Sequence, residues 1–357
     1  SWTRSGAVRS FLVCKGQFKQ EETAALGKPD PRTLAPLSIT PVPVHIPTSL
    51  PQPAPAPPVA ALSVMSIGSW PRPAWLMRSL HEHLEGRLAD ESFERDADDA
   101  VRLCVDAQLR CGVEVITDGE QRRDNYASFV GNRLDNCILI PLLDLLPLVD
   151  DPAKFEAEMN SLDVPAAKVR HPAVFGKLGR SRPLALHEFN FVTNLTTKPV
   201  KVALPGPYLL TRTMWMECIA DKAYTSREEL AVDIVRVLKE EIHFLLAAGV
   251  SIVQLDEPVL TEVVMTGPKN ARTFMCGALS ERGQIDDELN FARQLINAVT
   301  SGLPSERLGL HVCRGNWSPD ETVALSGDYR ASLPLFAQIN VGTLFLEYCT
   351  PRAGYLA

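Results

Sequence analysis

Two residues that bind transition metals well stand two positions apart late in the chain. His311 and Cys313 end an apolar stretch that begins at Leu308 and has the length of a buried strand. Since a strand turns residues i and i+2 toward one face, the imidazole and the thiol are expected to point to the same place. Glu347 ends the next predicted strand, which would lie about 5 Å away. A ring nitrogen, a thiolate and a carboxylate are ligands that Zn²⁺ accepts.

The same residues also permit a purely structural interpretation. Cys313 would then be a buried core thiol, His311 a hydrogen-bonded core histidine, and Glu347 the partner of an arginine. The residue types and their spacing leave both interpretations open. The elements that position these side chains have to decide between them.

Polar residues follow six apolar stretches in the same way. In parallel barrels the chemistry takes place at the carboxyl ends of the strands, so six such endings indicate one shared site. The endings are Gly68-Ser69-Trp70, Asp118-Gly119-Glu120, Pro205-Gly206-Pro207, Asp256-Glu257-Pro258, His311-Val312-Cys313 and Glu347-Tyr348-Cys349.

Short apolar segments alternate with amphipathic helical segments from residue 66 onward. The predicted strands cover residues 64–68, 113–117, 201–204, 251–255, 308–312 and 343–347. The predicted helices cover residues 96–111, 226–248 and 286–300. This order predicts β/α units around a parallel sheet.

Composition and charge fit a globular protein that acts on small molecules. The chain has 357 residues, 45% hydrophobic and 22% charged, enough for a large core. Its formal net charge of −7 argues against nucleic-acid binding, because proteins that bind nucleic acids concentrate Lys and Arg to neutralise phosphates. The longest apolar run, residues 137–149, is broken by Asp144, Pro141 and Pro147, so no membrane span is predicted.

The N-terminal residues and the cysteines bear on domains and compartment. Residues 1–64 are rich in Pro and lack periodicity, so we expect a disordered leader there, followed by one β/α domain at 65–357. The leader is basic before Glu21, so it is either an organelle-targeting segment or a reading frame that precedes a start at Met65. Eight scattered cysteines indicate a reducing compartment, and we expect a cytoplasmic protein.

Six motifs in a fixed order resemble the catalytic barrel of cobalamin-independent methionine synthase, of the short, single-barrel type. Each motif is weak by itself, but their order, with His-x-Cys in fifth place, is specific. The resemblance covers residues 65–357 and implies a TIM (β/α)8-type barrel. The motifs are Ile67-Gly68-Ser69-Trp70, Thr117-Asp118-Gly119-Glu120, Leu204-Pro205-Gly206-Pro207, Gln254-Leu255-Asp256-Glu257-Pro258, His311-Val312-Cys313 and Leu346-Glu347.

The resemblance implies a zinc ion held by His311, Cys313 and Glu347, which match three ligands of the family. The family's fourth ligand is a Cys at the end of the last barrel strand, and the chain ends at Ala357 before such a residue. We therefore expect a barrel that is truncated before its last strand or strands. Cys349 is an alternative fourth ligand, although a thiol just past a strand end is more often a packed residue.

Four further positions match the family's substrate contacts. Ser69, Glu120 and Asp256 match contacts to the amino-acid part of homocysteine, where carboxylates suit the ammonium group. Trp215 matches an aromatic residue near the folate. Structural alternatives are a helix cap for Ser69, an arginine partner for Glu120, a turn for Asp256 and a core position for Trp215.

The function that the resemblance implies is zinc-dependent transfer of a methyl group from a methyltetrahydrofolate-type donor to the thiol of homocysteine, which gives methionine. Transfer from a tertiary amine needs a proton at the departing nitrogen. The sequence does not identify the proton donor among His171, His187 and His243.

Three alternatives stay open. A related zinc enzyme would use a corrinoid donor or another thiol. A metal-free barrel of the uroporphyrinogen decarboxylase type would bind tetrapyrrole carboxylates through arginines such as Arg72, Arg122 and Arg123, and would leave the His-x-Cys without a task. An inactive fragment would retain only part of the site.

Overall fold

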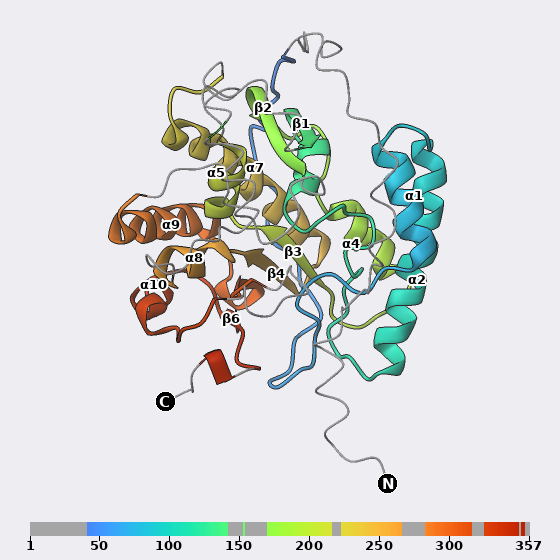
Figure 1. Cartoon of the computed structure of the whole chain (residues 1–357). Coiled ribbons are helices and arrows are strands. Elements are labelled where there is room, and N and C mark those ends of the chain that lie inside the picture. Colours follow the sequence, from blue (N-terminus) through green and yellow to red (C-terminus); the bar gives the residue numbers. More distant parts are fainter. Residues whose placement is uncertain are drawn as a thin grey trace. The chain divides into compact units, whose positions relative to one another are not determined.

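The computed structural model of the protein contains a parallel sheet of four strands in the order β3-β4-β5-β6 (Figure 1). The strands are β3 (Lys201–Pro205), β4 (Ile252–Asp256), β5 (Leu308–Val312) and β6 (Thr343–Leu346). Their bounds agree within a residue with four of the predicted strands. Every residue of β3 and β4 is buried, as expected for parallel strands that are covered on both faces.

The two other predicted strands join this sheet through single bridges. Met65 pairs with Val115, and Ile116 pairs with Val200, both in parallel. Six parallel segments thus follow one another in chain order, each beside its predecessor. The motifs that follow them are therefore brought to one edge of the sheet, as predicted.

Helices connect the parallel segments and cover the sheet (Figure 1). They are α1 (Ala74–Leu84), α2 (Asp90–Arg110), α4 (Leu186–Thr193), α5 (Pro207–Met214), α7 (Arg227–Ala248), α8 (Val259–Met265), α9 (Ile285–Thr300) and α10 (Leu333–Phe336). Short 3₁₀ turns are η2 (Ser128–Asn132), η6 (Ser305–Arg307), η8 (Arg330–Ser332) and η9 (Pro351–Ala353). The three predicted helices correspond to α2, α7 and α9. Helix α2 starts earlier than predicted, with two acids in its first turn, where they favour helix formation.

Capping residues fix the ends of α7, the longest of these helices. The Ser226 side chain accepts a hydrogen bond from the Glu229 main-chain nitrogen at 3.1 Å. At the other end, Gly249 has φ of 97°, a left-handed conformation that favours glycine. The chain therefore turns sharply out of α7 and into β4.

An antiparallel pair of strands, β1 (Asp135–Pro141) and β2 (Arg170–Gly179), precedes β3. The sequence did not predict this pair. The apolar run from Cys137 suggested only a membrane span, and Asp144, Pro141 and Pro147 argue against that span. No helix among the described residues is long and apolar enough to cross a membrane.

The structure describes residues 41–141, 153, 170–215, 223–265, 283–315, 325–349 and 351–353. The first forty residues of the expected leader therefore lie outside the described residues. Residues 41–64 contain no helix or strand.

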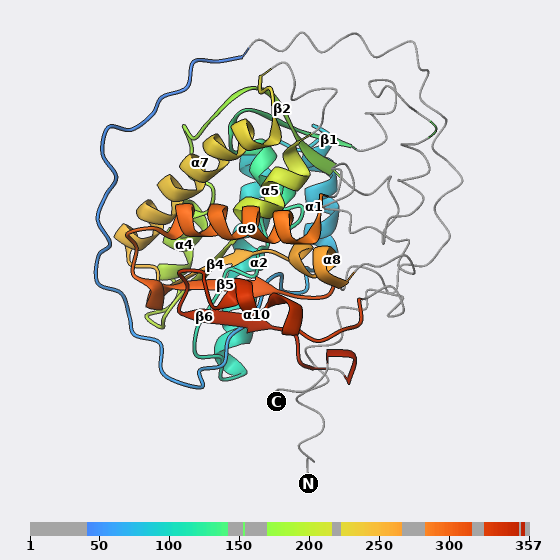
Figure 2. The same ribbon diagram turned by 90° about the vertical axis from the view of Figure 1, so that its left-hand side faces the viewer.

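Hydrogen bonds nevertheless hold part of the segment 41–64 against α7 and the start of β4 (Figure 2). The Ala54 main-chain nitrogen donates to Leu246 O at 3.1 Å. Pro57 O accepts from Ser251 Oγ at 2.8 Å. The proline-rich stretch therefore lies along the domain in an extended form, with carbonyl groups that bond to the domain.

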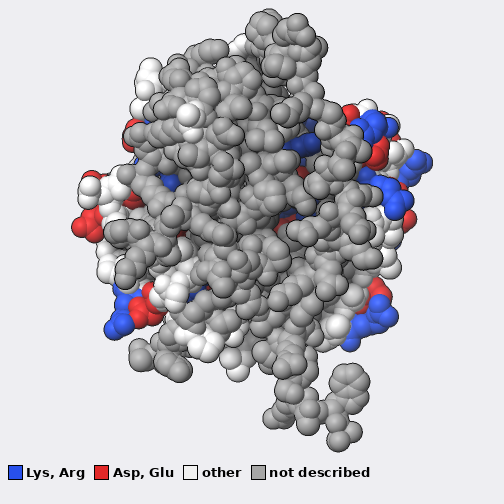
Figure 3. Space-filling model, in the orientation of Figure 1, with Lys and Arg blue, Asp and Glu red and all other residues white. Residues whose placement is uncertain are grey.

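Charges of both signs lie on the face of the molecule in Figure 3, where described Lys and Arg residues stand beside Asp and Glu residues. Exposed ion pairs among the described residues include Arg102 with Asp99 at 2.7 Å and Lys177 with Glu229 at 2.5 Å. Exposed pairs of this kind contribute little to stability. They do balance the charge of the surface locally.

The turn from β3 into α5 depends on Gly206. The Glu257 carboxylate accepts hydrogen bonds from the main-chain nitrogens of Tyr208 and Leu209, both at 2.8 Å, and so caps α5. A Cβ atom on Gly206 would lie 2.1 Å from Glu257 Oε1. Because both oxygens of Glu257 accept hydrogen bonds, its side chain cannot move away from an added Cβ atom without breaking one of them.

Gly206→Ala is therefore expected to lower the free energy of unfolding by about 1–3 kcal/mol, the usual cost of overpacking a buried site. Urea denaturation of the full chain measures this. Gly68→Ala is the control, since its Cβ would lie 3.5 Å from Glu120 Oε1, an ordinary contact. Equal stability of the two variants would contradict the assigned clash.

Candidate active site

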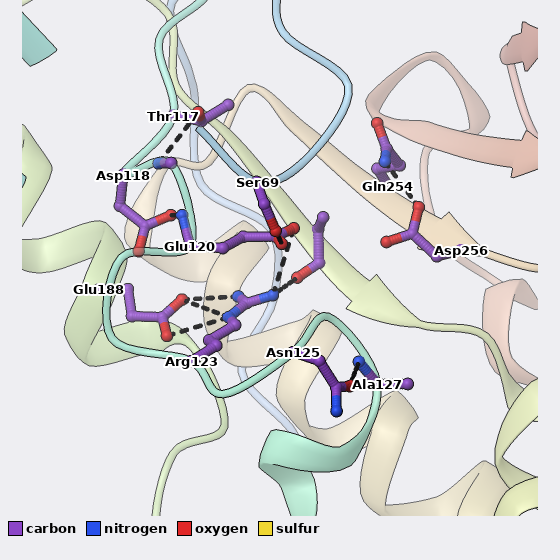
Figure 4. Close-up of polar contacts among 12 residues, drawn as sticks. Ser69, Thr117, Asp118, Glu120, Arg123, Asn125, Ala127, Glu188, Gln254 and Asp256 are labelled. Atoms are coloured by element: carbon purple, nitrogen blue, oxygen red, sulfur yellow. Dashed lines mark hydrogen bonds and ion pairs between the residues drawn. The ribbon is translucent and has the colours of Figure 1, made fainter. Parts of the chain in front are cut away.

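A tight turn after the second parallel segment orients the Glu120 side chain. Gly119 and Glu120 have φ of 69° and 54°, both left-handed, and the Glu120 main-chain nitrogen donates to Asp118 Oδ1 at 2.9 Å. A left-handed conformation at a residue other than glycine costs about 1–3 kcal/mol and is found mainly where function requires it. The turn brings Glu120 Oε2 to Ser69 Oγ, which donates to it at 2.5 Å (Figure 4).

Two arginines hold this turn in place. Arg123 forms a buried ion pair with Glu188 of α4 at 2.6 Å and donates to Ala203 O of β3 at 2.9 Å (Figure 4). Arg72 donates to the main-chain oxygens of Glu120 and Arg123, at 2.8 and 2.7 Å. The turn is thus bonded to helix α4, to strand β3 and to the segment that follows the first parallel segment.

Glu120 keeps one carboxylate oxygen without a hydrogen-bond partner. Its Oε1 atom is buried, and its ion partner, Arg123 Nη1, lies 3.7 Å away, beyond hydrogen-bond distance. Burial raises the pKa of Glu120, Arg123 lowers it, and Asp256 raises it further. A cation placed at Oε1 would satisfy this oxygen and favour the ionised form. The arginine partner that the sequence suggests for Glu120 is thus present, but it leaves the Oε1 atom without a hydrogen bond.

Asp256 and His311 meet across the sheet. They are paired residues in the parallel register of β4 and β5, and Asp256 Oδ1 lies 2.8 Å from His311 Nδ1. Burial lowers the pKa of His311, but hydrogen bonds to Asp256 and Cys313 outweigh it and raise the pKa to about 10. With Nδ1 directed at the carboxylate, the Nε2 atom of His311 is the one left for a ligand.

Glu347 has other contacts in this structure. Its Oε2 atom accepts a hydrogen bond from the Arg314 main-chain nitrogen at 3.0 Å, and the Arg314 side chain donates to its main-chain oxygen. Among the described residues, no group of three or more His, Cys, Asp or Glu side chains is arranged to hold a metal ion. The donor types suit zinc, and His311 and Cys313 are in contact, whereas Glu347 as the third ligand stays a prediction. Cys349 is exposed and forms no disulfide.

Trp215 caps the C-terminal end of α5 and packs partly buried against the main hydrophobic core. Residues 216–222, which follow it, lie outside the described part of the chain. These contacts agree with the core position that the sequence left open. They do not test a contact to folate.

The three histidines considered as proton donors lie in different places. His171 is buried in β2. His187 stands in α4 beside Arg133, and burial together with this arginine lowers the pKa of His187 to about 3, so the ring is neutral at pH 7. His243 lies in α7, with Nδ1 3.0 Å from Pro51 O of the proline-rich segment. None of these contacts identifies the donor.

Sequence reasoning missed two buried polar residues beneath Asp256. The Lys201 ammonium donates to Ile67 O at 2.8 Å and bonds to Gln254 Oε1, and Gln254 Nε2 donates to Asp256 Oδ1 at 2.7 Å (Figure 4). The signal that could have found them is a long polar side chain inside an apolar strand. Such a residue needs an internal partner, because burial without one is costly.

Residues 62–283 match the family model described as "Cobalamin-independent synthase, Catalytic domain". The methionine synthase of Saccharolobus solfataricus is 26% identical over 253 residues, which cover 71% of this chain and 62% of that protein. That of Sulfolobus acidocaldarius is 28% identical over 261 residues, covering 73% and 63%. The chain thus spans less than two thirds of the length of these relatives.

Two solved structures match with a TM-score of 0.52. A B12-independent methionine synthase from Shewanella sp. W3-18-1, in complex with selenomethionine, is 21% identical and covers 83% of this chain and 73% of its own. A Listeria monocytogenes protein, assigned as a vitamin B12-independent methionine synthase, is 17% identical and covers 85% and 84%. At these identities the likeness concerns the fold, an α/β fold with a parallel sheet. The family match ends before His311, so the metal ligands stay a prediction.

The buried ammonium of Lys201 predicts a dependence of stability on pH. Burial lowers its pKa from 10.5 to about 8, although Asp256 and Glu120 raise it. Between these values the unfolded chain binds more protons than the folded one, so stability should rise with pH. Urea denaturation at several pH values between about 8 and 10.5 measures this. Over that range the free energy of unfolding of the native chain should rise by up to about 3 kcal/mol more than that of Lys201→Met. Lys198→Met, which removes the lysine bonded to Val113 O, should keep the native slope.

Proposed function

The chain belongs to the family of cobalamin-independent methionine synthase catalytic domains, and from this premise we propose that it methylates the thiol of homocysteine. The methyl group comes from a methyltetrahydrofolate-type donor, and the product is methionine. His311, Cys313 and Glu347 hold the zinc ion that the reaction requires. The substrates are small molecules.

The observation that carries this proposal is the buried Glu120 Oε1 atom, which has no hydrogen-bond partner. A buried carboxylate oxygen needs a donor, and the ammonium group of an amino acid supplies three. Ser69 Oγ already donates to the other oxygen, Oε2, and this bond fixes the direction in which Oε1 points. Selenomethionine, the ligand of the Shewanella structure, carries the same ammonium group as homocysteine and methionine. This supports an amino acid as the substrate.

The metal-binding part of the proposal rests on His311 and Cys313. Asp256 takes the Nδ1 side of His311 at 2.8 Å, the arrangement by which a carboxylate orients a metal-binding imidazole. A bound Zn²⁺ would lower the pKa of the substrate thiol, so that the sulfur is a thiolate at neutral pH. Glu347 would have to leave the Arg314 main-chain nitrogen, its partner here, in order to join.

The reaction forms a bond between sulfur and the methyl carbon and breaks the bond between that carbon and the donor nitrogen. The nitrogen takes up a proton as the methyl group leaves. His187 does not supply this proton near pH 7, because its pKa of about 3 keeps the ring neutral. Glu120 and Asp256 hold the amino acid in place while the thiol sulfur approaches the methyl carbon.

The arginines that a tetrapyrrole-binding decarboxylase would need are engaged elsewhere. Arg72 donates to two main-chain oxygens, and Arg123 pairs with Glu188. Arg122 pairs with Glu94 and Asp98. These partners leave only single donor atoms, Arg72 Nε and Arg122 Nη1, without a hydrogen bond, so none of the three guanidinium groups is free as a whole for a substrate carboxylate, and the methyltransferase is the better supported function.

The full chain is expected to bind about one zinc ion, and Cys313→Ser is expected to lose it, because the thiolate is a principal ligand. Elemental analysis after dialysis measures the metal. Cys349→Ser is the matched control and should keep zinc; its loss there would make Cys349 a ligand as well. A native chain that binds no zinc would show that zinc-dependent transfer is wrong for this protein.

Glu120→Gln is expected to weaken methionine binding by about 10- to 100-fold, because it removes a charge-assisted hydrogen bond of about 1.5–3 kcal/mol. Isothermal titration calorimetry with methionine measures the affinity. Glu94→Gln removes a partly exposed carboxylate that pairs with Arg122, and it should leave the affinity unchanged. Native affinity in Glu120→Gln would remove Glu120 from the amino-acid site.

A further inference from the structure

Four side chains from three neighbouring strands form one continuous chain of hydrogen bonds beneath the candidate site. Lys201 of β3 bonds to Gln254 Oε1 of β4. Gln254 Nε2 donates to Asp256 Oδ1 at 2.7 Å, and the same Oδ1 lies 2.8 Å from His311 Nδ1 of β5. We refer to Lys201, Gln254, Asp256 and His311 as the relay.

The ammonium group decides which way the Gln254 amide points. Lys201 can only donate, so it fixes the amide oxygen on its own side. The amide nitrogen then faces Asp256 and also donates to Ile67 O at 2.9 Å. If the amide turned over, its oxygen would face the Asp256 carboxylate, and two acceptors would oppose each other. Lys201, together with the acceptors Ile67 O and Asp256 Oδ1, therefore sets the orientation of the amide.

The amide in turn holds the carboxylate. Gln254 and Asp256 are two residues apart in β4 and so share a face of the strand. Asp256 Oδ1 forms hydrogen bonds with both Gln254 Nε2 and His311 Nδ1. With two donors on one oxygen, the carboxylate has a fixed rotation, and the imidazole that bonds to it is fixed as well.

We propose that Lys201 and Gln254 are positioning residues for the metal site: through Asp256 they orient His311 so that its Nε2 atom is presented to the metal ion. This inference rests on the proposed role of His311 as a zinc ligand. Neither Lys201 nor Gln254 touches the metal or the substrate. They act through the Oδ1 atom of Asp256.

A packing role alone does not account for Lys201. Its Nζ atom lies 4.8 Å from the centre of the Phe345 ring, and the residue is only 1% exposed. Burial of an ammonium group costs free energy that an apolar side chain of the same length would avoid. The cost is offset by bonds to Ile67 O and to the Gln254 amide oxygen, together with the Phe345 ring and the charges of Asp256 and Glu120, and the bond to the amide oxygen controls the relay.

The test measures the zinc affinity of the full chain by competition with a chromophoric chelator. Lys201→Met and Gln254→Met each break the relay without altering a ligand, and each should weaken zinc binding about tenfold, as changes behind a metal ligand commonly do. The double variant should bind no more weakly than Gln254→Met, because both act through one oxygen atom. Thermal unfolding shows whether each variant is folded.

Lys198→Met is the matched control. It removes a lysine that bonds to a main-chain oxygen, Val113 O, just before β3, and it should leave zinc affinity unchanged. If Lys201→Met fails to fold, Gln254→Met alone decides. Native affinity in a folded relay variant would overturn this proposal while leaving the proposed function intact. A native chain that binds no zinc would overturn both this proposal and the proposed function, and that result is obtained before any variant is made.

Discussion

The parallel register of β4 and β5 places Asp256 opposite His311, and the candidate site depends on this pairing. A shift of one residue would turn every side chain of β5 to the other face. His311 would then lose the carboxylate at 2.8 Å, and Cys313 would leave the same side. The register is held by apolar residues that are buried on both faces of these strands, so the packing of the sheet and the geometry of the site share one cause.

Buried charges surround this pairing, and each of them needs a partner. Arg123 and Glu188 neutralise one another at 2.6 Å, and Lys201 is satisfied by a main-chain oxygen and an amide. Glu120 differs from these pairs, because its Oε1 atom has no hydrogen bond, and neither has Oδ2 of the neighbouring Asp118. The Oε1 atom of Glu120 is therefore available to a group that comes from outside the chain. An ammonium group meets that need.

The sequence predicted the parallel strands well, because parallel strands covered on both faces are almost continuous apolar runs, but it did not predict the antiparallel pair β1 and β2. It placed Ser69 and Glu120 at one shared site through the polar endings of their strands and through family resemblance, and the structure joins them at 2.5 Å. It could not predict Lys201 and Gln254, whose bond spans 53 positions and depends on how β3 and β4 lie side by side. Glu347 remains a predicted ligand, since its contact with Arg314 depends on a loop conformation that strand patterns do not specify.

Family resemblance assigns Glu120 and Asp256 the same task, yet their contacts separate them. Asp256 Oδ1 already receives Gln254 and His311, whereas Glu120 has an oxygen without a donor. Both donors to Asp256 lie on Oδ1, which leaves only Oδ2 for a substrate, and Oδ1 is committed to His311. We infer that Glu120 provides most of the attraction for an ammonium group, and that Asp256 chiefly orients His311. Two carboxylates on one edge of the sheet thus differ in role because their neighbours differ.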